Sequence, residues 1–158
     1  MRLRKLLIGV LVNSCLFSTA NADVLFQMSA VPGQDICENL TGPWAGGGTM
    51  TAKVIGINIK CDYYGNATVT KPSTDSYVVD VVFDLQSGSA VCPGQQAYTL
   101  PGTCDSQTGA IVLKTNDVQL HGNIDSAGNQ ATLQGTVKIN IMNRSVTGNV
   151  NNLVLNKQ

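Results

Sequence analysis

The chain has 158 residues, of which 13% are charged, and its ten basic and ten acidic side chains give a formal net charge of zero. This balance excludes a nucleic-acid protein driven by phosphate neutralisation, and an apolar content of 43% excludes a wholly disordered chain. The composition is also too poor in Leu, Glu, Lys and Arg for a helical bundle.

The first 22 residues have the order of a secretory signal peptide. A basic start over 2–5 precedes an apolar run over 6–17, and Ala20-Asn21-Ala22 supplies small residues for cleavage after Ala22. The apolar run is shorter than the ~20 residues that a membrane-spanning helix needs. Cys15 loosely resembles the lipidated Cys of a bacterial lipobox, but Asn13 fits that motif poorly. We therefore expect a bacterial protein that is secreted or periplasmic.

Removal of the signal peptide changes the charge of the chain. Three basic residues leave with it, so seven Lys and Arg remain against ten Asp and Glu, which gives −3. A mildly acidic chain with no run of like charge predicts neither a nucleic-acid nor a membrane partner.

After the signal peptide we expect an N-terminal arm over 23–39 and a β domain over 40–158. Apolar and polar residues alternate with a period of two, which predicts about eight antiparallel strands. The fold class is therefore all-β, as an up-and-down β-barrel, with a β-sandwich as the alternative because both show the same alternation. At Gly56 the apolar parity changes, which indicates a bulge or bend. The expected strands are 49–63, 67–71, 77–85, 95–100, 110–115, 117–125, 131–141 and 146–150.

Two expected hairpin turns bring small residues together. A two-residue loop at Gly128-Asn129 places Gly122 opposite Gly135, and a turn centred on Asn143-Arg144 places Asn152 opposite Gly135. A row of small residues with one amide would then cross the inner face of the sheet. Gly122, Gly135 and Asn152 are therefore candidate ligand-binding residues, while a bend of the barrel is the alternative role for the two glycines.

Four cysteines remain after the signal peptide, and an even number in an exported chain predicts two disulfides. Of the three possible pairings, proximity in the chain favours Cys37–Cys61 and Cys92–Cys104. The sequence contains no C-x-x-C motif and a single His, so we expect no metal site.

Leu40-Thr41-Gly42-Pro43-Trp44, followed by further glycines, resembles the first-strand Gly-x-Trp signature of calycin-type barrels, which include lipocalins, avidins and nitrobindins. The resemblance implies a barrel whose Trp packs at the closed end and whose interior binds a small ligand. Trp44 is accordingly a candidate ligand-binding residue. The resemblance implies no particular ligand. The biotin-contacting pattern of avidins has several tryptophans, whereas Trp44 is the only one here, and the haem of nitrobindins needs a His, whereas His121 alternates onto the polar face.

The sequence offers little for catalysis. His121 is the only imidazole, and Asp80 and Asp84 would lie about 13 Å apart on one strand, too far for a glycosidase pair. We therefore predict no catalytic residue and no cofactor, and an exported barrel that binds a small apolar ligand. The alternative is a protein-interaction module or enzyme inhibitor, which would bind through a loop clamped between Cys92 and Cys104.

Overall fold

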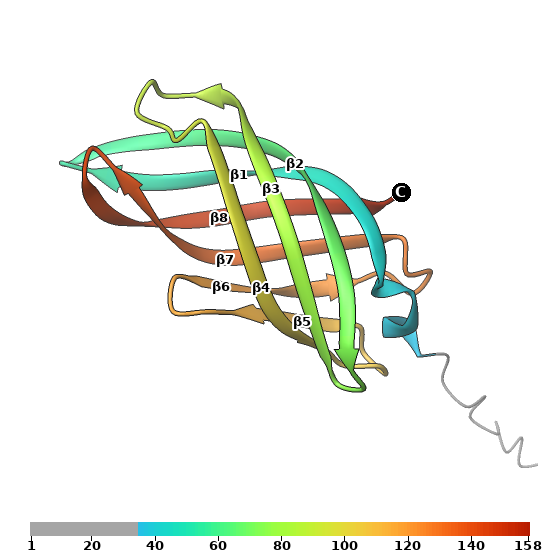
Figure 1. Ribbon diagram of the computed structural model, residues 1–158. Coiled ribbons are helices and arrows are strands. Elements are labelled where there is room, and N and C mark those ends of the chain that lie inside the picture. Colours follow the sequence, from blue (N-terminus) through green and yellow to red (C-terminus); the bar gives the residue numbers. More distant parts are fainter. Residues whose placement is uncertain (1–34) are drawn as a thin grey trace, which may run out of the picture. The chain divides into compact units, whose positions relative to one another are not determined.

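The computed structural model describes residues 35–158, which form a closed barrel of eight antiparallel strands (Figure 1). Each strand pairs with the next in the chain, and β1 pairs with β8. The predicted up-and-down barrel is therefore confirmed, and the sandwich alternative is wrong. In chain order the elements are η1 (Ile36–Leu40), β1 (Gly42–Val54), β2 (Ile57–Ser73), β3 (Ser76–Gly88), β4 (Gln95–Cys104), β5 (Ala110–Lys114), β6 (Val118–Ile124), β7 (Gln130–Ile141) and β8 (Arg144–Lys157).

The described chain begins within the expected arm. The predicted signal peptide, Cys15 and most of 23–39 lie outside the described residues, and the end of the arm forms the short 3-10 helix η1. Within residues 35–158, no helix is long and apolar enough to cross a membrane.

The predicted alternation places apolar side chains inside the barrel. On β3, for example, Tyr77, Val79 and Val81 are buried, while Asp80 and Asp84 on the other face are exposed. None of the fully buried side chains among the described residues is polar or charged, so the interior is an apolar core.

The strand expected over 49–63 is wrong, because Gly56 lies in a hairpin turn. Ile55 and Gly56 have φ angles of 48° and 81°, and they form the two-residue loop between β1 and β2. Positive φ at both loop positions defines a type I′ turn, whose twist matches that of the flanking strands. The apolar parity changes at Gly56 because the chain reverses there, not because one strand bends.

The β6–β7 loop is also longer than expected. It spans 125–129 in place of the two residues Gly128-Asn129, because the Asp125 carboxylate organises it. This carboxylate accepts hydrogen bonds from the backbone N–H groups of Asn129 (2.7 Å) and Gln130 (3.1 Å). The pairing of β6 with β7 is shifted as a result.

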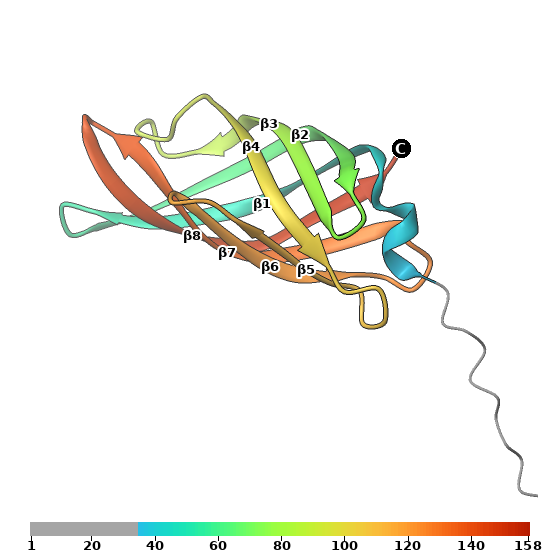
Figure 2. The same ribbon diagram turned by 60° about the horizontal axis from the view of Figure 1, so that its bottom comes forward.

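The barrel has two different ends (Figures 1 and 2). We call the end that carries the turns β1–β2, β3–β4, β5–β6 and β7–β8 the open end. The other end carries the remaining turns and η1, whose Leu40 is buried, and we call it the closed end.

Each end is fastened by one disulfide. Cys37 bonds with Cys104 at the closed end, and Cys61 bonds with Cys92 at the open end, with Cα–Cα distances of 6.0 and 5.9 Å. The two predicted disulfides are confirmed, but the predicted pairing is wrong. In an up-and-down barrel each strand carries the chain to the opposite end. One strand separates the two cysteines of each predicted pair, so they lie at opposite ends of the barrel. The clamped 92–104 loop does not exist, since Pro101 and Gly102 belong to β4.

These bonds constrain the chain strongly. The bonded cysteines are 67 and 31 residues apart, and the chain-entropy model assigns roughly 4 kcal/mol of stabilisation to each loop. Disulfides of this kind are typical of proteins that fold in an oxidising compartment.

Closure of the barrel depends on close packing between β1 and β8. A Cβ atom on Gly46 would lie 2.0 Å from the carbonyl oxygen of Val154, and one on Gly48 would lie 2.8 Å from the Cα of Leu153. The pairing of β1 with β8 shifts between Gly47 and Thr49, which marks a bulge at this point. Glycine is required here because the backbones of the first and last strands come too close for a side chain.

We expect Gly46→Ala to destabilise the fold by at least about 2 kcal/mol, because its methyl group overlaps the β8 backbone. Chemical denaturation followed by circular dichroism measures the change. Gly94→Ala is the matched control, since no atom lies within 4 Å of its Cβ position, and it should change stability by less than about 1 kcal/mol. Equal effects of the two substitutions would contradict the close approach.

The Asp125 loop predicts a pH dependence. Hydrogen bonds from the backbone N–H groups of Gln130 and Asn129 lower the pKa of Asp125 below its ordinary value of 3.8. The ionised carboxylate therefore stabilises the fold above about pH 4, and this contribution is lost as pH falls through the lowered pKa. Asp125→Asn should be less stable than the native chain at neutral pH, and the difference should shrink in acid. A difference that stays constant down to pH 2 would contradict this role.

Candidate ligand-binding site

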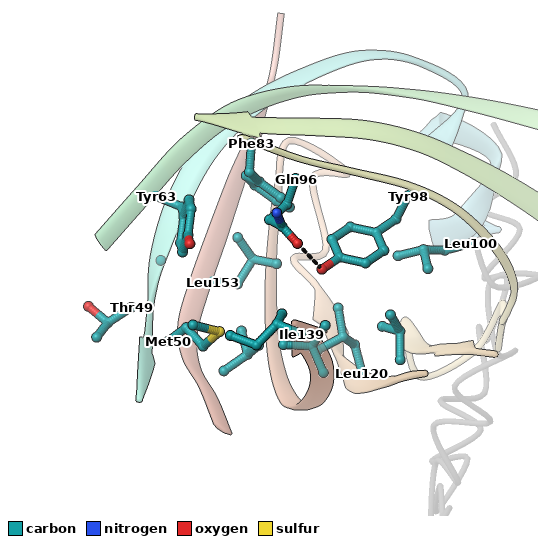
Figure 3. Close-up of a pocket in the computed structure, with 14 residues that line it drawn as sticks. Thr49, Met50, Tyr63, Phe83, Gln96, Tyr98, Leu100, Leu120, Ile139 and Leu153 are labelled. Atoms are coloured by element: carbon teal, nitrogen blue, oxygen red, sulfur yellow. Dashed lines mark hydrogen bonds between the residues drawn. The ribbon is translucent and has the colours of Figure 1, made fainter. Parts of the chain in front are cut away.

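The barrel interior contains two small apolar cavities stacked along its length. The cavity nearer the open end, which we call the open-end cavity, has a volume of about 70 Å³ and is lined by fourteen residues (Figure 3). The second, which we call the floor cavity, has a volume of about 40 Å³ and includes Trp44 and Leu40. Leucines on several strands fill the space around and between them, among them Leu100, Leu113, Leu120, Leu133 and Leu153.

The wall exposes apolar surface to the open-end cavity, and among its polar side chains Gln96 and Tyr98 form a polar edge by bonding to each other. The Tyr98 hydroxyl donates a hydrogen bond to Gln96 Oε1 over 3.1 Å, and both side chains face the cavity (Figure 3). Across the mouth, the Tyr63 hydroxyl donates to the carbonyl of Pro93 over 2.9 Å. That bond fastens the β3–β4 loop beside the cavity, close to the Cys61–Cys92 disulfide.

This wall carries no charge. The fourteen lining residues include no Lys, Arg, His, Asp or Glu. Burial raises the pKa of Tyr63, with a smaller contribution from Tyr98, and burial likewise raises the pKa of Tyr98. Both phenols therefore stay neutral at physiological pH. An ionised ligand would lose its hydration here without gaining a counter-charge.

The size of the cavity limits its occupant. A void of about 70 Å³ is smaller than the ~150 Å³ cavity that accepts benzene, and far smaller than the ~300–1,000 Å³ pockets of drug-sized ligands. As it stands it holds only a short stretch of alkyl chain, so a longer ligand such as octanol would have to displace side chains around the cavity, including partly exposed ones such as Phe83.

Trp44 forms the floor of the closed end, where the resemblance places it. Its side chain is 2% exposed, and its indole Nε1 donates to the carbonyl of Leu40 over 2.8 Å. The Tyr77 hydroxyl donates to the carbonyl of Cys37 over 3.1 Å, so η1 is held from two sides. Trp44 lines the floor cavity and not the open-end cavity, and a ligand-binding role for it stays a prediction.

The expected row of small residues is absent from the inner face. Gly122 pairs with Leu133 and Gly135 pairs with Leu120, so the predicted pairing of the two glycines is wrong. Both lie at tight approaches, since a Cβ on either would lie 1.9 Å from a carbonyl oxygen of the neighbouring strand. A side chain at either position is therefore excluded by the neighbouring backbone, and the alternative role of the glycines in bending the barrel stays a prediction.

Asn152 is also displaced from its expected position. Gly135 pairs with Val150, and Asn152 lies at a register shift of β8 with an exposed side chain and a φ of 50°. Asn tolerates this left-handed conformation better than most residues, which explains its presence at the bulge. Asn152 and Gly122 border a shallow hollow on the outer surface, and a ligand-binding role for them and for Gly135 stays a prediction.

Sequence reasoning missed the residues of the polar edge. Gln96, Tyr98 and Leu100 alternate along the strand expected over 95–100, and that parity could have placed them on one face. Phe83 alternates with Tyr77, Val79 and Val81 along β3, but nothing in the sequence brings it together with Gln96, its cross-strand partner on β4.

The single histidine, which could act as a general base or a metal ligand, lies on the surface outside the cavity. His121 is exposed, and its Nε2 lies 3.4 Å from the side-chain nitrogen of Gln134. Among residues 35–158, no three His, Cys, Asp or Glu side chains gather in a way that could hold a metal ion.

Comparisons with known proteins add little to this geometry. No protein-family model matches the sequence, and no curated protein matches it either. The fold is similar to a solved structure of the siderocalin Ex-FABP, described as functioning through dual ligand specificities. The identity is 12% and the TM-score 0.42, over 76% of this chain and 74% of that chain. The calycin-like architecture therefore stands on the closed eight-strand order and on Trp44 beneath η1.

We expect Trp44→Phe to destabilise the protein by about 1–3 kcal/mol, because it removes the hydrogen bond to Leu40 and leaves that buried carbonyl without its donor. Urea denaturation followed by circular dichroism checks this. Tyr64→Phe, which changes a side chain that is 51% exposed, should alter stability by less than about 0.5 kcal/mol. A neutral Trp44→Phe would mean that the indole does not hold η1.

Proposed function

We propose that this protein binds one small, uncharged, largely apolar molecule in the open-end cavity and carries it without chemical change. The observation that supports this most is the chemistry of the cavity wall. Its exposed surface is apolar, it contains no charged side chain, and the Tyr98 hydroxyl and the Gln96 amide in its wall are bonded to each other.

The polar edge favours a particular head group. The Tyr98 hydroxyl uses its proton on Gln96, which leaves lone pairs on the hydroxyl oxygen free to accept. The Gln96 amide nitrogen already donates to the carbonyl of Gln95. A ligand that donates a hydrogen bond, such as an alcohol, suits this edge, whereas a carboxylate only accepts. A straight alkyl chain behind that head group would enter with the least displacement of the side chains that surround this small cavity.

The compartment agrees with such a role. Two disulfides favour an oxidising environment, and the predicted signal peptide would deliver the chain to the periplasm or the medium. The resemblance to calycin-type barrels implies the same class of function. A carrier of small apolar molecules is useful in such a compartment because those molecules dissolve poorly in water.

We expect octanol to bind at least about tenfold more tightly than octanoate, because the carboxylate would be buried without a partner. Isothermal titration calorimetry on the oxidised protein measures both affinities. Val150→Phe places an aromatic ring in the cavity and should abolish octanol binding. Val154→Phe is the matched control, since Val154 is the neighbour of inward-facing Leu153 and Leu155 on the same strand and points outward.

Two results would contradict the proposal. One is equal binding of octanol by the native chain and by a folded Val150→Phe variant, which would place the ligand outside the cavity. The other is a preference for octanoate, which would mean that a cation faces the ligand. Near-native circular dichroism of both variants is required for either conclusion.

A further inference from the structure

Two hairpin tips at the open end expose large apolar side chains. Ile55 and Ile57 on the β1–β2 hairpin are 69% and 68% exposed, and Met142 on the β7–β8 hairpin is 66% exposed. In both views these two hairpins project beyond the other turns of the same end (Figures 1 and 2). The molecule therefore presents two apolar points in one direction.

Folding does not explain the choice of these residues. Ile55 and Met142 have φ angles of 48° and 51° and occupy the first loop position of two-residue turns. Asn, Asp or Gly would adopt this left-handed conformation with less strain, and a β-branched residue such as Ile is disfavoured there. Both turns thus carry an apolar side chain in water at a cost in backbone strain.

Basic residues lie next to both hairpin tips. Lys53 and Arg144 lie beside the β1–β2 and β7–β8 turns, and Lys114 ends β5 at the same end. Among residues 35–158, none of these three cations forms an ion pair. Asp117, in the β5–β6 turn, lies 3.7 Å from Lys138 and is neutralised by it.

The acidic residues of the barrel strands at this half have side-chain partners, a lysine for Asp62 and a neutral amide for Asp84. Asp62 lies 3.3 Å from Lys60, and Asp84 accepts a hydrogen bond from the Gln95 side chain over 2.8 Å. The closed end has the opposite character, with Lys71 and Lys157 as its cations. Its acidic side chains are Asp35, Glu38, Asp75, Asp105 and Asp125.

We propose that the open end docks on an anionic lipid bilayer. Ile55, Ile57 and Met142 would insert among the head groups, while Lys53 and Arg144 would contact lipid phosphates. The segregation of charge supports an anionic surface, since the acidic end then faces away from it. Two separate projecting points suit a deformable surface, because a rigid protein partner would need two pockets at a fixed spacing.

The docking would also bring the mouth of the open-end cavity to the bilayer, where small apolar molecules collect. The inference nevertheless does not depend on the proposed function, since it stands on the tips and their charges alone. The inference reverses the expectation that the protein has no membrane partner. That expectation is based on the net charge of the whole chain, which cannot reveal that the two ends of the barrel differ in charge.

Cosedimentation with vesicles tests the proposal. The oxidised protein, with its N-terminus identified by mass spectrometry, is mixed with phosphatidylcholine vesicles that contain or lack phosphatidylglycerol. Contact of Lys53 and Arg144 with lipid phosphates predicts roughly tenfold or more tighter binding to the anionic vesicles, and weaker binding at high salt. The double variant Ile55→Asn/Met142→Asn should lose at least about tenfold in vesicle affinity.

The same double variant should be as stable as the native chain or more stable, because Asn relieves the strain of both turns. Loss of binding therefore cannot be ascribed to unfolding, and the shared N-terminus excludes a contribution from that segment. Octanol affinity should be unchanged, since neither residue lines the cavity. Val112→Thr, which alters an exposed apolar residue on the barrel wall, should bind vesicles like the native chain.

Three results would overturn the proposal. The native chain could fail to sediment with either kind of vesicle, or the double variant could bind as tightly as the native chain. Dimerisation that the double variant abolishes, without vesicle binding, would identify a second copy as the occupant of the tips.

Discussion

The pairing of β1 with β8 is the constraint on which the rest of the structure depends. An open sheet with one apolar face would leave two unpaired edges, whereas closure pairs every strand with two neighbours. Closure requires the first and last strands to approach too closely for a side chain at Gly46 and Gly48. Once the barrel is closed, the apolar residues that alternate along all eight strands face one interior and pack there as a core.

The two ends of this closed barrel then acquire different tasks. At the closed end, the Cys37–Cys104 disulfide and the Trp44 indole hold η1 against the barrel. At the open end, the Cys61–Cys92 disulfide and the Tyr63 hydroxyl fix the β3–β4 loop beside the cavity. The polar edge, the projecting tips and the basic residues Lys53, Lys114 and Arg144 lie toward this second end. The proposed binding and the proposed docking therefore follow from one asymmetry.

Much of the fold could be predicted from the sequence because alternation reports directly on burial. The barrel follows from this alternation, the two disulfides from the even number of cysteines, and the floor position of Trp44 from the resemblance of residues 40–44 to calycin-type barrels. Strand register depends on the length of each turn, and the length of the β6–β7 loop depends on the Asp125 carboxylate, which the pattern does not reveal. A register error of this kind moved Gly135 away from its expected partner. The disulfide pairing failed for a related reason, since it requires knowing at which end each cysteine lies.

The central claim is that a neutral ligand enters the interior and does not adhere to exposed apolar residues. Nuclear Overhauser contacts between octanol and methyl groups of the isotopically labelled protein test it most directly. If octanol occupies the open-end cavity, contacts should appear to the methyl groups of Met50, Leu120 and Ile139, which line it. Contacts confined to the exposed methyl groups of Ile55, Ile57 and Val112 would contradict it.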